Sequence, residues 1–405
     1  MRTVRILQFN PTTGAKMPEL KLRDADEGAA QVEAIGVPPP ARIGDPVSAI
    51  DTPSLILDLD AFEENLRTMQ VLAERHGVAL RPHAKAHRCP DISLRQIALG
   101  ADGICCQKVH EAVPFVAAGV RDIHISNEVV GDAKLAVLAR LARQARITVC
   151  VDHPRAAEAL SAMMAEHDVS VGVLVEVDVG QKRCGVQTPE EAVSLAQLVS
   201  RLPNVSLAGI QAYHGGLQHR RDLDQRKKLC GKTAKLVRRY LDAFAAEGLA
   251  CPVVSGGGTG TALFDVASGV FTEIQAGTYA FMDMDYAGID WGEALSFRHS
   301  LFLLGTVMST PTAERAVMDF GLKSTTIESG LPGVVGHEGL QCVSVSDEHS
   351  VLEADSRRHR PEIGTKVRLV PAHCDPTFNL HDCVVAIRGD HVEAVWPISA
   401  RGLSR

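Results

Sequence analysis

The sequence predicts an α/β protein in which a TIM (β/α)8 barrel is followed by a C-terminal β-rich domain. In the first part, short apolar runs rich in β-branched residues alternate with amphipathic stretches, which is typical of βα units with a parallel sheet. Eight such units fit a TIM barrel better than an open doubly wound sheet, which usually has about five or six strands. From Ser296 onward, strands follow one another without helices between them, which predicts the β-rich domain.

The predicted strands are read from these apolar runs. The eight barrel strands are GVALRPH, DGICCQ, DIHISN, RITVCVD, SVGVLVEVD, SLAGIQAYH, PVVSGG and FTEIQA. One further run, PSLILDLD, precedes them, and the capping-box spacing of Asp60 and Glu63 predicts that a helix starts at Asp60. The β-rich part contains SLFLLGTVMS, RAVMDFG, LQCVSVSD, TKVRLVPAH and CVVAIRGDHVEAVWPI, the last of these a hairpin that turns at Gly389 and Asp390.

These elements divide the chain into four expected parts. Residues 1–45 form a peripheral N-terminal extension, because the proline-rich segment VPPPARIGDP favours extended backbone. Residues 46–60 carry a strand that joins the β domain. The barrel occupies residues 61–290, and the β-rich domain occupies residues 291–405.

Composition restricts the class of partner. A chain of 405 residues with 45% hydrophobic side chains can bury a large core. Its formal net charge of -7 and the lack of a dense Lys/Arg cluster argue against nucleic acid or a membrane surface, and favour a small molecule. The ten cysteines lack zinc-ribbon spacing, no signal peptide opens the chain, and no run of about 18 apolar residues occurs. We therefore expect a cytoplasmic protein with reduced cysteines.

Polar side chains recur at the ends of the predicted barrel strands, where TIM barrels carry their catalytic groups. Lys85, in RPHAKAHRCP, directly follows the first strand and should point into the barrel mouth. Corresponding places on the next five strands hold Gln107, Asn127, Asp152, Arg183 and Tyr213. Each residue alone is equally consistent with an ordinary polar loop position, but their recurrence favours a functional site.

Glycine-rich segments end the last two predicted barrel strands. The seventh strand ends in SGGGTGT and the eighth in QAGTYAF. Glycines let main-chain N–H groups close on a phosphate, and barrels commonly bind phosphate in these two loops. A single glycine-rich run is as often an ordinary tight turn as a phosphate-binding loop. Two of them near a strand-end lysine predict pyridoxal 5'-phosphate (PLP), which forms a Schiff base with lysine and is anchored through its phosphate.

The segment PAHCDPTFNLHD in the β-rich part predicts a metal site. If this segment is extended, His373 and Asp375 share one face while Cys374 points away. Two ligands suit an open site that water or substrate completes, and not a closed structural zinc site. An imidazole and a carboxylate without a thiolate favour Mn²⁺ or Mg²⁺, with Co²⁺ as a further candidate. Taken alone, the pair is also consistent with a loop that caps a proline turn.

Together these motifs resemble the D-threonine aldolase family, which belongs to the alanine-racemase-like, fold-type III PLP enzymes. The resemblance runs from about residue 38 to the C-terminus and includes 3-hydroxy-D-aspartate aldolase and D-serine dehydratase as close relatives. The motifs that carry it are RPHAKAH, CCQKV, HISNEVV, EVDVGQKRCG, QAYHGGLQH, SGGGTGT, AGTYAFMD, DFGLKST, DEHSV, HCDPTFNLHD and ISARG.

This resemblance implies roles for individual residues. It makes Lys85 the Schiff-base lysine, His373 and Asp375 the metal ligands, and His219 a base, although His219 alone would read as a surface residue beside a basic segment. It also implies a homodimer. It places Arg183 and Tyr213 near the cofactor ring, and Ser255, Gly256, Gly257, Gly277 and Thr278 around the phosphate. Gln107 is also expected at the cofactor, because of its strand-end position.

The implied activity is PLP- and divalent-metal-dependent retro-aldol cleavage of D-3-hydroxy-amino acids, with D-threonine giving glycine and acetaldehyde as the first expectation. The D stereochemistry follows from the resemblance alone. The alternatives are a 3-hydroxy-D-aspartate aldolase, a D-serine or hydroxyaspartate dehydratase, and a non-catalytic PLP-binding protein. In the resembling dehydratases a cysteine is the second metal ligand, so Asp375 favours an aldolase. Non-catalytic carriers resemble the barrel alone, whereas this chain also has the β domain.

Overall fold

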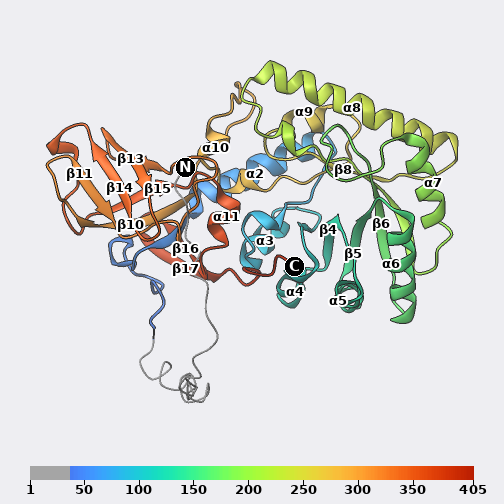
Figure 1. Cartoon of the computed structure of the whole chain (residues 1–405), viewed down its shortest axis with the longest axis horizontal. Helices are drawn as coiled ribbons and strands as arrows, with labels where there is room; N and C mark the ends of the chain where they lie inside the picture. The colour runs from blue at the N-terminus through green and yellow to red at the C-terminus, as the bar shows by residue number, and fades with distance from the viewer. Residues whose placement is uncertain (1–36) are drawn as a thin grey trace, which may run out of the picture. The chain divides into compact units, whose positions relative to one another are not determined.

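Two separate sheets organise the part of the chain that the computed structural model describes, residues 37–405 (Figure 1). Most of the predicted N-terminal extension, residues 1–36, lies outside the described residues. Residues from Pro40 to Arg405 form one unit that holds both sheets. Within the described residues, no helix has the length and apolar character needed to cross a bilayer.

The first sheet is the predicted barrel. Its eight parallel strands are β2 (Ala79–Leu80), β3 (Ile104–Cys106), β4 (Asp122–Glu128), β5 (Arg146–Val151), β6 (Val171–Glu176), β7 (Val205–Gln211), β8 (Val253–Gly256) and β9 (Glu273–Ile274). Hydrogen bonds from Asp102 N to Leu80 O (3.0 Å) and from Cys105 N to Pro82 O (2.8 Å) connect β3 to the chain around β2. Because β2 also pairs with β9, the sheet closes, and the TIM-barrel prediction is confirmed.

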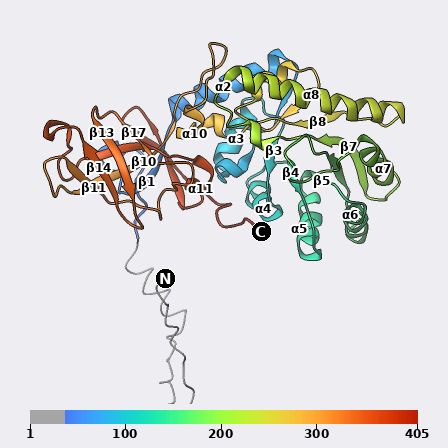
Figure 2. The same ribbon diagram turned by 45° about the horizontal axis from the view of Figure 1, so that its top comes forward.

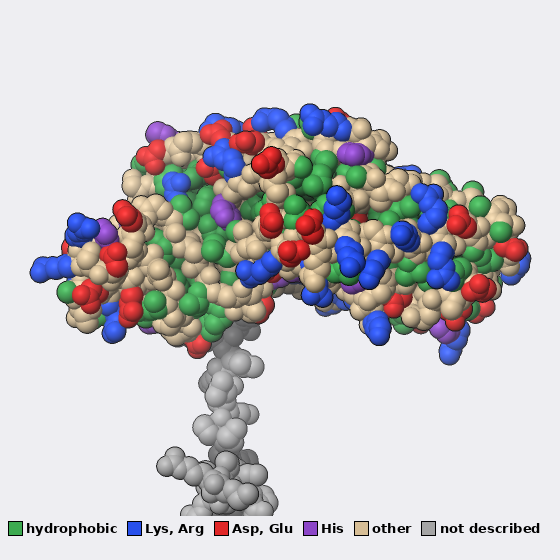
Figure 3. Space-filling model, turned by 90° about the horizontal axis from the view of Figure 1, so that it is seen from above, with side chains coloured by type: hydrophobic (Ala, Val, Ile, Leu, Met, Phe, Trp, Pro, Cys, Tyr) green, Lys and Arg blue, Asp and Glu red, His purple; other side chains and the backbone are tan. Residues whose placement is uncertain are grey.

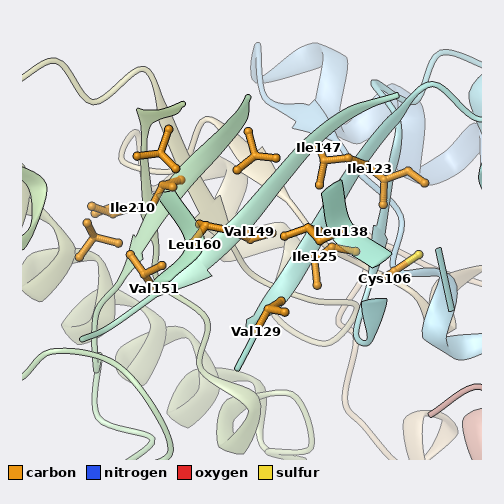
Figure 4. Close-up of a cluster of buried hydrophobic side chains, with 14 of the residues drawn as sticks. Cys106, Ile123, Ile125, Val129, Leu138, Ile147, Val149, Val151, Leu160 and Ile210 are labelled. Atoms are coloured by element: carbon orange, nitrogen blue, oxygen red, sulfur yellow. The ribbon is translucent and has the colours of Figure 1, made fainter. Parts of the chain in front are cut away.

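Helices follow the strands and cover the outside of the barrel (Figure 2). They are α3 (Pro90–Ala98), α4 (Val109–Ala117), α5 (Asp132–Ala142), α6 (Pro154–Glu166), α7 (Pro189–Val199), α8 (Leu223–Ala246) and α9 (Ala262–Ala267). Local signals start them: α7, for example, has a proline in its first turn and a capping box between Thr188 and Glu191. Figure 4 shows how Ile125 and Val149 of the strands pack with Leu138 and Leu160 of the helices.

Helix α2 (Leu59–Arg75) begins before the residue that the sequence indicated. The prediction that it starts at Asp60 is wrong, because Asp58 caps the helix by accepting a hydrogen bond from Ala61 N (3.1 Å). Glu63 does not close a capping box, since its carboxylate accepts a hydrogen bond from Arg388 (2.8 Å) in the β domain. A distant arginine therefore competes with the local cap for Glu63.

The second sheet forms the β-rich domain, and its first strand precedes the barrel in the sequence. Strand β1 (Ser54–Asp58) pairs with β10 and β16. The predicted hairpin is confirmed, with Gly389 in the turn at φ 59°. Two strands, β12 and β14, were not predicted. The remaining strands are β10 (Leu301–Ser309), β11 (Arg315–Met318), β12 (Gly333–Val335), β13 (Leu340–Val345), β14 (Ser350–Ala354), β15 (Lys366–Val370), β16 (Cys383–Arg388) and β17 (His391–Pro397).

Two short helices bring the β domain to the barrel mouth. Helix α10 (Met284–Ala287) follows the last barrel strand, and its backbone donates hydrogen bonds from Met284 N to Pro371 O (3.2 Å) and from Asp285 N to Ala372 O (3.3 Å). These bonds fix the segment that leads into α11 (Cys374–Phe378), which lies between the β domain and α3 in Figure 1. The predicted metal-binding segment is thus held against the barrel.

One face of the molecule agrees with the charge pattern of the sequence. Figure 3 shows acidic and basic side chains interspersed over one face of the molecule. Mixed charge of this kind does not form the continuous basic surface that binding to nucleic acid requires.

Candidate active site

A cavity of about 240 Å³ opens at the carboxyl ends of the barrel strands. Four residues predicted from strand ends or motifs, Lys85, Gln107, Arg183 and Tyr213, line this cavity, which we call the barrel cavity. The structure therefore brings together side chains that are far apart in the sequence. The full lining consists of His83, Lys85, Gln107, Ser126, Arg183, Gln211, Tyr213 and Gln275.

Two of the strand-end residues do not line the barrel cavity. Neighbouring residues of a strand face opposite sides, and in β4 it is Ser126, not Asn127, that faces the cavity. Asp152 instead accepts a hydrogen bond from Gly185 N (3.1 Å) and lines a different cavity. Both residues lie at strand ends as expected, but neither lines the barrel cavity, because strand-end position alone does not determine the direction of a side chain.

Lys85 connects the barrel cavity to the β domain. It lies in a short 3-10 helix, Ala84–Ala86, which residues 81–83 separate from β2. Its Nζ atom is 2.8 Å from Oδ2 of Asp375, and 41% of its side chain is exposed. Nearby Asp375 raises the pKa of Lys85 although burial opposes this. Burial alone would raise the pKa of Asp375, but Lys85 and His373 lower it to about 2.

A buried histidine that the sequence analysis missed lies two residues before Lys85. Burial and the neighbouring Lys85 charge lower the pKa of His83 well below its ordinary value, so its imidazole is neutral. Its Nε2 atom is 3.0 Å from Ser126 Oγ and 3.2 Å from Gln107 Oε1. His83 therefore helps to orient Gln107 at the cavity wall. Its position two residues from the strand-end lysine was the available signal.

His373 and Asp375 come together as predicted, but on a different backbone. His373 Nε2 lies 3.9 Å from Asp375 Oδ1. Only His373 is extended (φ -145°), whereas Asp375 lies in the first turn of α11, so the expectation of an extended segment is wrong. Cys374 points away: it is fully buried, and its sulfur lies 3.7 Å from Met282 O.

The donor set of this pair fits a divalent cation. Asp375 Oδ1 is buried and accepts no hydrogen bond from the described residues. The other imidazole nitrogen, His373 Nδ1, is 2.7 Å from Oε1 of Glu328, which the sequence analysis missed. A carboxylate at Nδ1 leaves Nε2 free to bind a metal. His373 and Asp375 line a second cavity of about 500 Å³. Lys85 and Gln107 line both this cavity and the barrel cavity.

His219 lines neither of these cavities. Its Nδ1 atom is 2.9 Å from Asp285 Oδ2, and its ring centroid is 4.9 Å from that of Tyr286. Asp285 belongs to α10, and its amide bonds to Ala372, next to His373. A carboxylate at Nδ1 fixes the proton there and leaves Nε2 as the acceptor of a second proton. The segment that carries the metal pair therefore also holds His219.

The glycine-rich loops offer main-chain donors. The amides of Gly257, Gly277 and Thr278 donate no hydrogen bond within residues 37–405. A side chain at Gly256 would place its β carbon 2.6 Å from Ala212 O, so only glycine fits there. Free amides on two adjacent loops, together with the exposed amine of Lys85, fit the phosphate and the aldehyde of PLP.

Ser255 is the predicted phosphate residue whose side chain faces elsewhere. It is fully buried, its hydroxyl donates to Glu273 Oε1 (2.6 Å), and it accepts a hydrogen bond from Gln275 Nε2 (2.7 Å). Its hydroxyl is therefore occupied inside the barrel. Gln275 itself lines the barrel cavity, so Ser255 acts on that wall through a neighbour.

Comparison with known proteins places this geometry in a family. A family model for the alanine racemase N-terminal domain matches residues 57–285. A second model, described as a putative serine dehydratase domain, matches residues 300–387. The two matches correspond to the barrel with its preceding helix and to most of the β-rich domain.

Individual relatives span nearly the whole chain. D-threonine aldolase from Arthrobacter sp is 54% identical over 92% of this chain and 99% of the relative. 3-Hydroxy-D-aspartate aldolase from Paracoccus denitrificans is 44% identical over 91% of this chain and 96% of the relative. The crystal structure of D-threonine aldolase from Filomicrobium marinum is 44% identical and superposes with a TM-score of 0.89, covering 91% of this chain and all of that one. The chain therefore belongs to the D-threonine aldolase family, and its barrel is an alanine racemase N-terminal domain.

Proposed function

We propose that this protein is a PLP- and divalent-metal-dependent carbon–carbon lyase that cleaves D-3-hydroxy-amino acids, with D-threonine giving glycine and acetaldehyde. The observation that carries the proposal is the meeting of a strand-end lysine and an imidazole–carboxylate pair, with Lys85 Nζ 2.8 Å from Asp375 Oδ2. A cofactor-binding amine and a metal-binding pair this close can act on one small substrate. The identity of 54% to a D-threonine aldolase supports the choice of reaction.

The barrel cavity would hold the cofactor. In this proposal Lys85 binds it covalently, Arg183, Tyr213 and Gln107 lie around its ring, and the phosphate meets the amides of the glycine-rich loops. PLP supplies an electron sink that stabilises negative charge at the substrate α carbon when a bond to that carbon breaks. The residues assigned to the phosphate are Ser255, Gly256, Gly257, Gly277 and Thr278, with Ser255 acting through Gln275.

His373 and Asp375 would hold the cation through Nε2 and the unpaired Oδ1. Mn²⁺ or Mg²⁺ is favoured and Co²⁺ is acceptable, because neither ligand is a thiolate. A divalent cation there acts as a Lewis acid that makes a hydroxyl easier to deprotonate.

His219 is the proposed base for the β-hydroxyl of the substrate. Asp285 holds its Nδ1 atom at 2.9 Å, so Nε2 can accept the hydroxyl proton. Cleavage of the Cα–Cβ bond then releases an aldehyde, and a proton added at Cα completes glycine. The side chain of His219 is 44% exposed, so the proton that it takes from the β-hydroxyl can pass to water afterwards.

Asp375 also favours the aldolase over the dehydratase. The dehydratase is considered because part of the chain matches a model described as a putative serine dehydratase domain. In the resembling dehydratases, which remove hydroxide from the substrate, the second metal ligand is a cysteine. Here the neighbouring thiol cannot take that role, because Cys374 is buried with its sulfur against Met282 O. The metal pair likewise argues against a non-catalytic PLP-binding protein.

The test is a product assay on protein reconstituted with PLP and Mn²⁺. D-threonine, D-phenylserine, 3-hydroxy-D-aspartate and L-threonine are compared, and glycine plus aldehyde is measured beside ammonia plus keto acid. We expect glycine from the D substrates, loss of turnover on chelation with retention of the cofactor absorbance, and recovery with Mn²⁺. Ammonia and keto acid as the main products would replace the proposal with the dehydratase, and full activity of metal-stripped protein would contradict the metal role.

Two finer expectations accompany this function. We infer a homodimer from the fold-type III resemblance, which light scattering on purified protein can check. We also infer a cytoplasmic location, supported by the ten cysteines, all of which are free.

A further inference from the structure

Arg183 brings a guanidinium group to the barrel cavity, but packing does not fix it there. Its side chain is 44% exposed and follows β6 on a loop. Its guanidinium carbon lies 5.6 Å from the ring centroid of Tyr213, and Nη2 lies 3.5 Å from Oε1 of Glu176. Long arginine side chains have many rotamers, so the ion pair with Glu176 can help to select among them.

Glu176 belongs to a cluster in which it is the buried member, while Glu128 and Cys184 are half-buried. It ends β6 and is 4% exposed. Oxygens of Glu176 and of Glu128, at the end of β4, lie within 4.8 Å of each other and of the sulfur of Cys184. Oε1 of Glu128 is buried and has no hydrogen-bond partner among residues 37–405. Because one carboxyl group is buried and the other turns a buried oxygen toward it, a charge on both at once is strongly disfavoured.

The charges in this cluster balance if the carboxyl pair keeps one proton. Burial and the neighbouring Glu128 raise the pKa of Glu176 to about 8, while Arg183 opposes the shift. A pair with one proton carries a single negative charge, which the guanidinium of Arg183 matches. The same proton is the donor that Glu128 Oε1 otherwise lacks, and it belongs to the pair and not to one residue.

The other titratable groups around the pair stay neutral at moderate pH. Burial raises the pKa of Cys150, on β5, well above its ordinary value. Burial, Glu128 and Glu176 raise the pKa of Cys184 to about 11. Arg183 stays charged throughout. Within this cluster, a proton lost near pH 8 therefore comes from the carboxyl pair.

We propose that Glu176, sharing one proton with Glu128, is a positioning residue that sets the place of Arg183 in the barrel cavity. This inference rests on the proposed function, since it assumes that the cofactor ring binds beside Arg183. With one proton, the pair attracts the guanidinium only enough to hold it against Tyr213. Without that proton, the doubled negative charge draws Arg183 away from the cavity and toward Glu176.

The first measurement follows the proton itself. In the infrared spectrum of the holoenzyme, the carbonyl band of a buried protonated carboxyl should disappear as pH rises through about 8. In Glu176→Gln this titrating band should disappear, because the carboxyl group with the raised pKa is gone. In Glu128→Gln the band should titrate at lower pH, because burial still raises the pKa of Glu176 but the neighbouring like charge no longer does. A wild-type protein without the band would overturn the proposal, and this result does not depend on any aldolase activity.

The second measurement follows Arg183 through the cofactor. The visible absorbance and kcat of the wild type should change with pH in the same window as the infrared band. In Glu176→Gln we expect no such transition and a kcat about tenfold lower with little change in KM. In Glu128→Gln the pKa of Glu176 falls, so the transition should move to lower pH. Unchanged spectra and pH profiles in both variants would overturn the proposal.

A control and a double-mutant cycle separate positioning from general loosening of the loop. Asp152→Asn removes a carboxylate charge that holds the same loop through Gly185 N, and it should leave the pH profile unchanged. Combined with Arg183→Lys, Glu176→Gln should cost little further activity, because its effect passes through the guanidinium. Fully additive losses would show that Glu176 acts without Arg183. Failure of the wild type to bind PLP would instead contradict the proposed function.

Discussion

The barrel mouth and the metal-binding segment of the β domain build their parts of the site in different ways. The barrel cavity takes side chains from many strand ends, among them Lys85, Arg183 and Gln275, and closure of the sheet brings them together. His373 and Asp375 are two residues apart on one segment, so their approach needs only a local turn. We infer that the barrel depends on global folding for cofactor binding, whereas the metal pair depends on a few contacts that α10 and Glu328 supply.

The two regions meet in the ion pair between Lys85 and Asp375. Each residue has a further role in the proposed function, Lys85 toward the cofactor and Asp375 toward the cation. Damage to one region should therefore leave binding at the other measurable. The following substitutions test whether cofactor binding and metal binding are independent in this way.

Lys85→Ala should have the largest effect. Removing the only lysine that lines the barrel cavity among the described residues should abolish both the visible absorbance of lysine-bound PLP and all measurable cleavage. Mn²⁺ binding, measured by calorimetry, should persist, because neither metal ligand is altered. Retention of the absorbance band would mean that another lysine, such as Lys108, carries the cofactor.

His219→Asn should lower kcat by about 1000-fold, since loss of a general base commonly costs between 100-fold and 10,000-fold. Cofactor absorbance and Mn²⁺ affinity should not change, because His219 lines neither cavity. Asp285→Asn is the matched variant: it keeps the base but weakens its orientation, so its loss should be smaller. Equal activity of His219→Asn and the wild type would assign the base elsewhere.

The parts of this site that the sequence could predict are those whose residues lie close together in the sequence or follow a strand pattern. Strand periodicity placed Lys85 correctly at a strand end, and the spacing of His373 and Asp375 anticipated their approach. The interaction of Glu328 with His373 joins residues 45 positions apart. This contact forms only when distant loops of the β domain come together on folding, and no local pattern marks it.

The start of α2 shows the same limit at smaller scale. Both Asp58 and Asp60 can cap a helix, and the sequence favoured Asp60 because Glu63 follows at the right spacing. In the folded chain Glu63 binds Arg388 of the β domain, so the other aspartate becomes the cap. Tertiary contacts decide between local signals of similar strength.

Asp375→Cys should lower glycine production by about 100-fold, since a displacement of about 1 Å at a reacting group can cost that much. A thiolate should also bind Zn²⁺ in preference to Mn²⁺. The variant is reconstituted with each ion, and glycine plus aldehyde is measured beside ammonia plus keto acid. Unchanged glycine production and metal preference would show that Asp375 does not bind the metal.

Glu328 offers the smallest and most specific change to the β-domain part of the site. Its carboxylate lies 2.7 Å from His373 Nδ1 and is half exposed, so its removal should not disturb folding. Partners of this kind orient a metal-binding imidazole, and their loss costs about 10-fold to 100-fold in metal affinity. We expect Glu328→Ala to weaken Mn²⁺ binding by about tenfold and Glu328→Gln, which keeps an acceptor for Nδ1–H, to weaken it less. Calorimetry gives both values, and the PLP absorbance should match that of the wild type in each variant. If instead PLP binding falls together with Mn²⁺ affinity, the two regions are coupled through Lys85 and Asp375 more tightly than their separate construction implies.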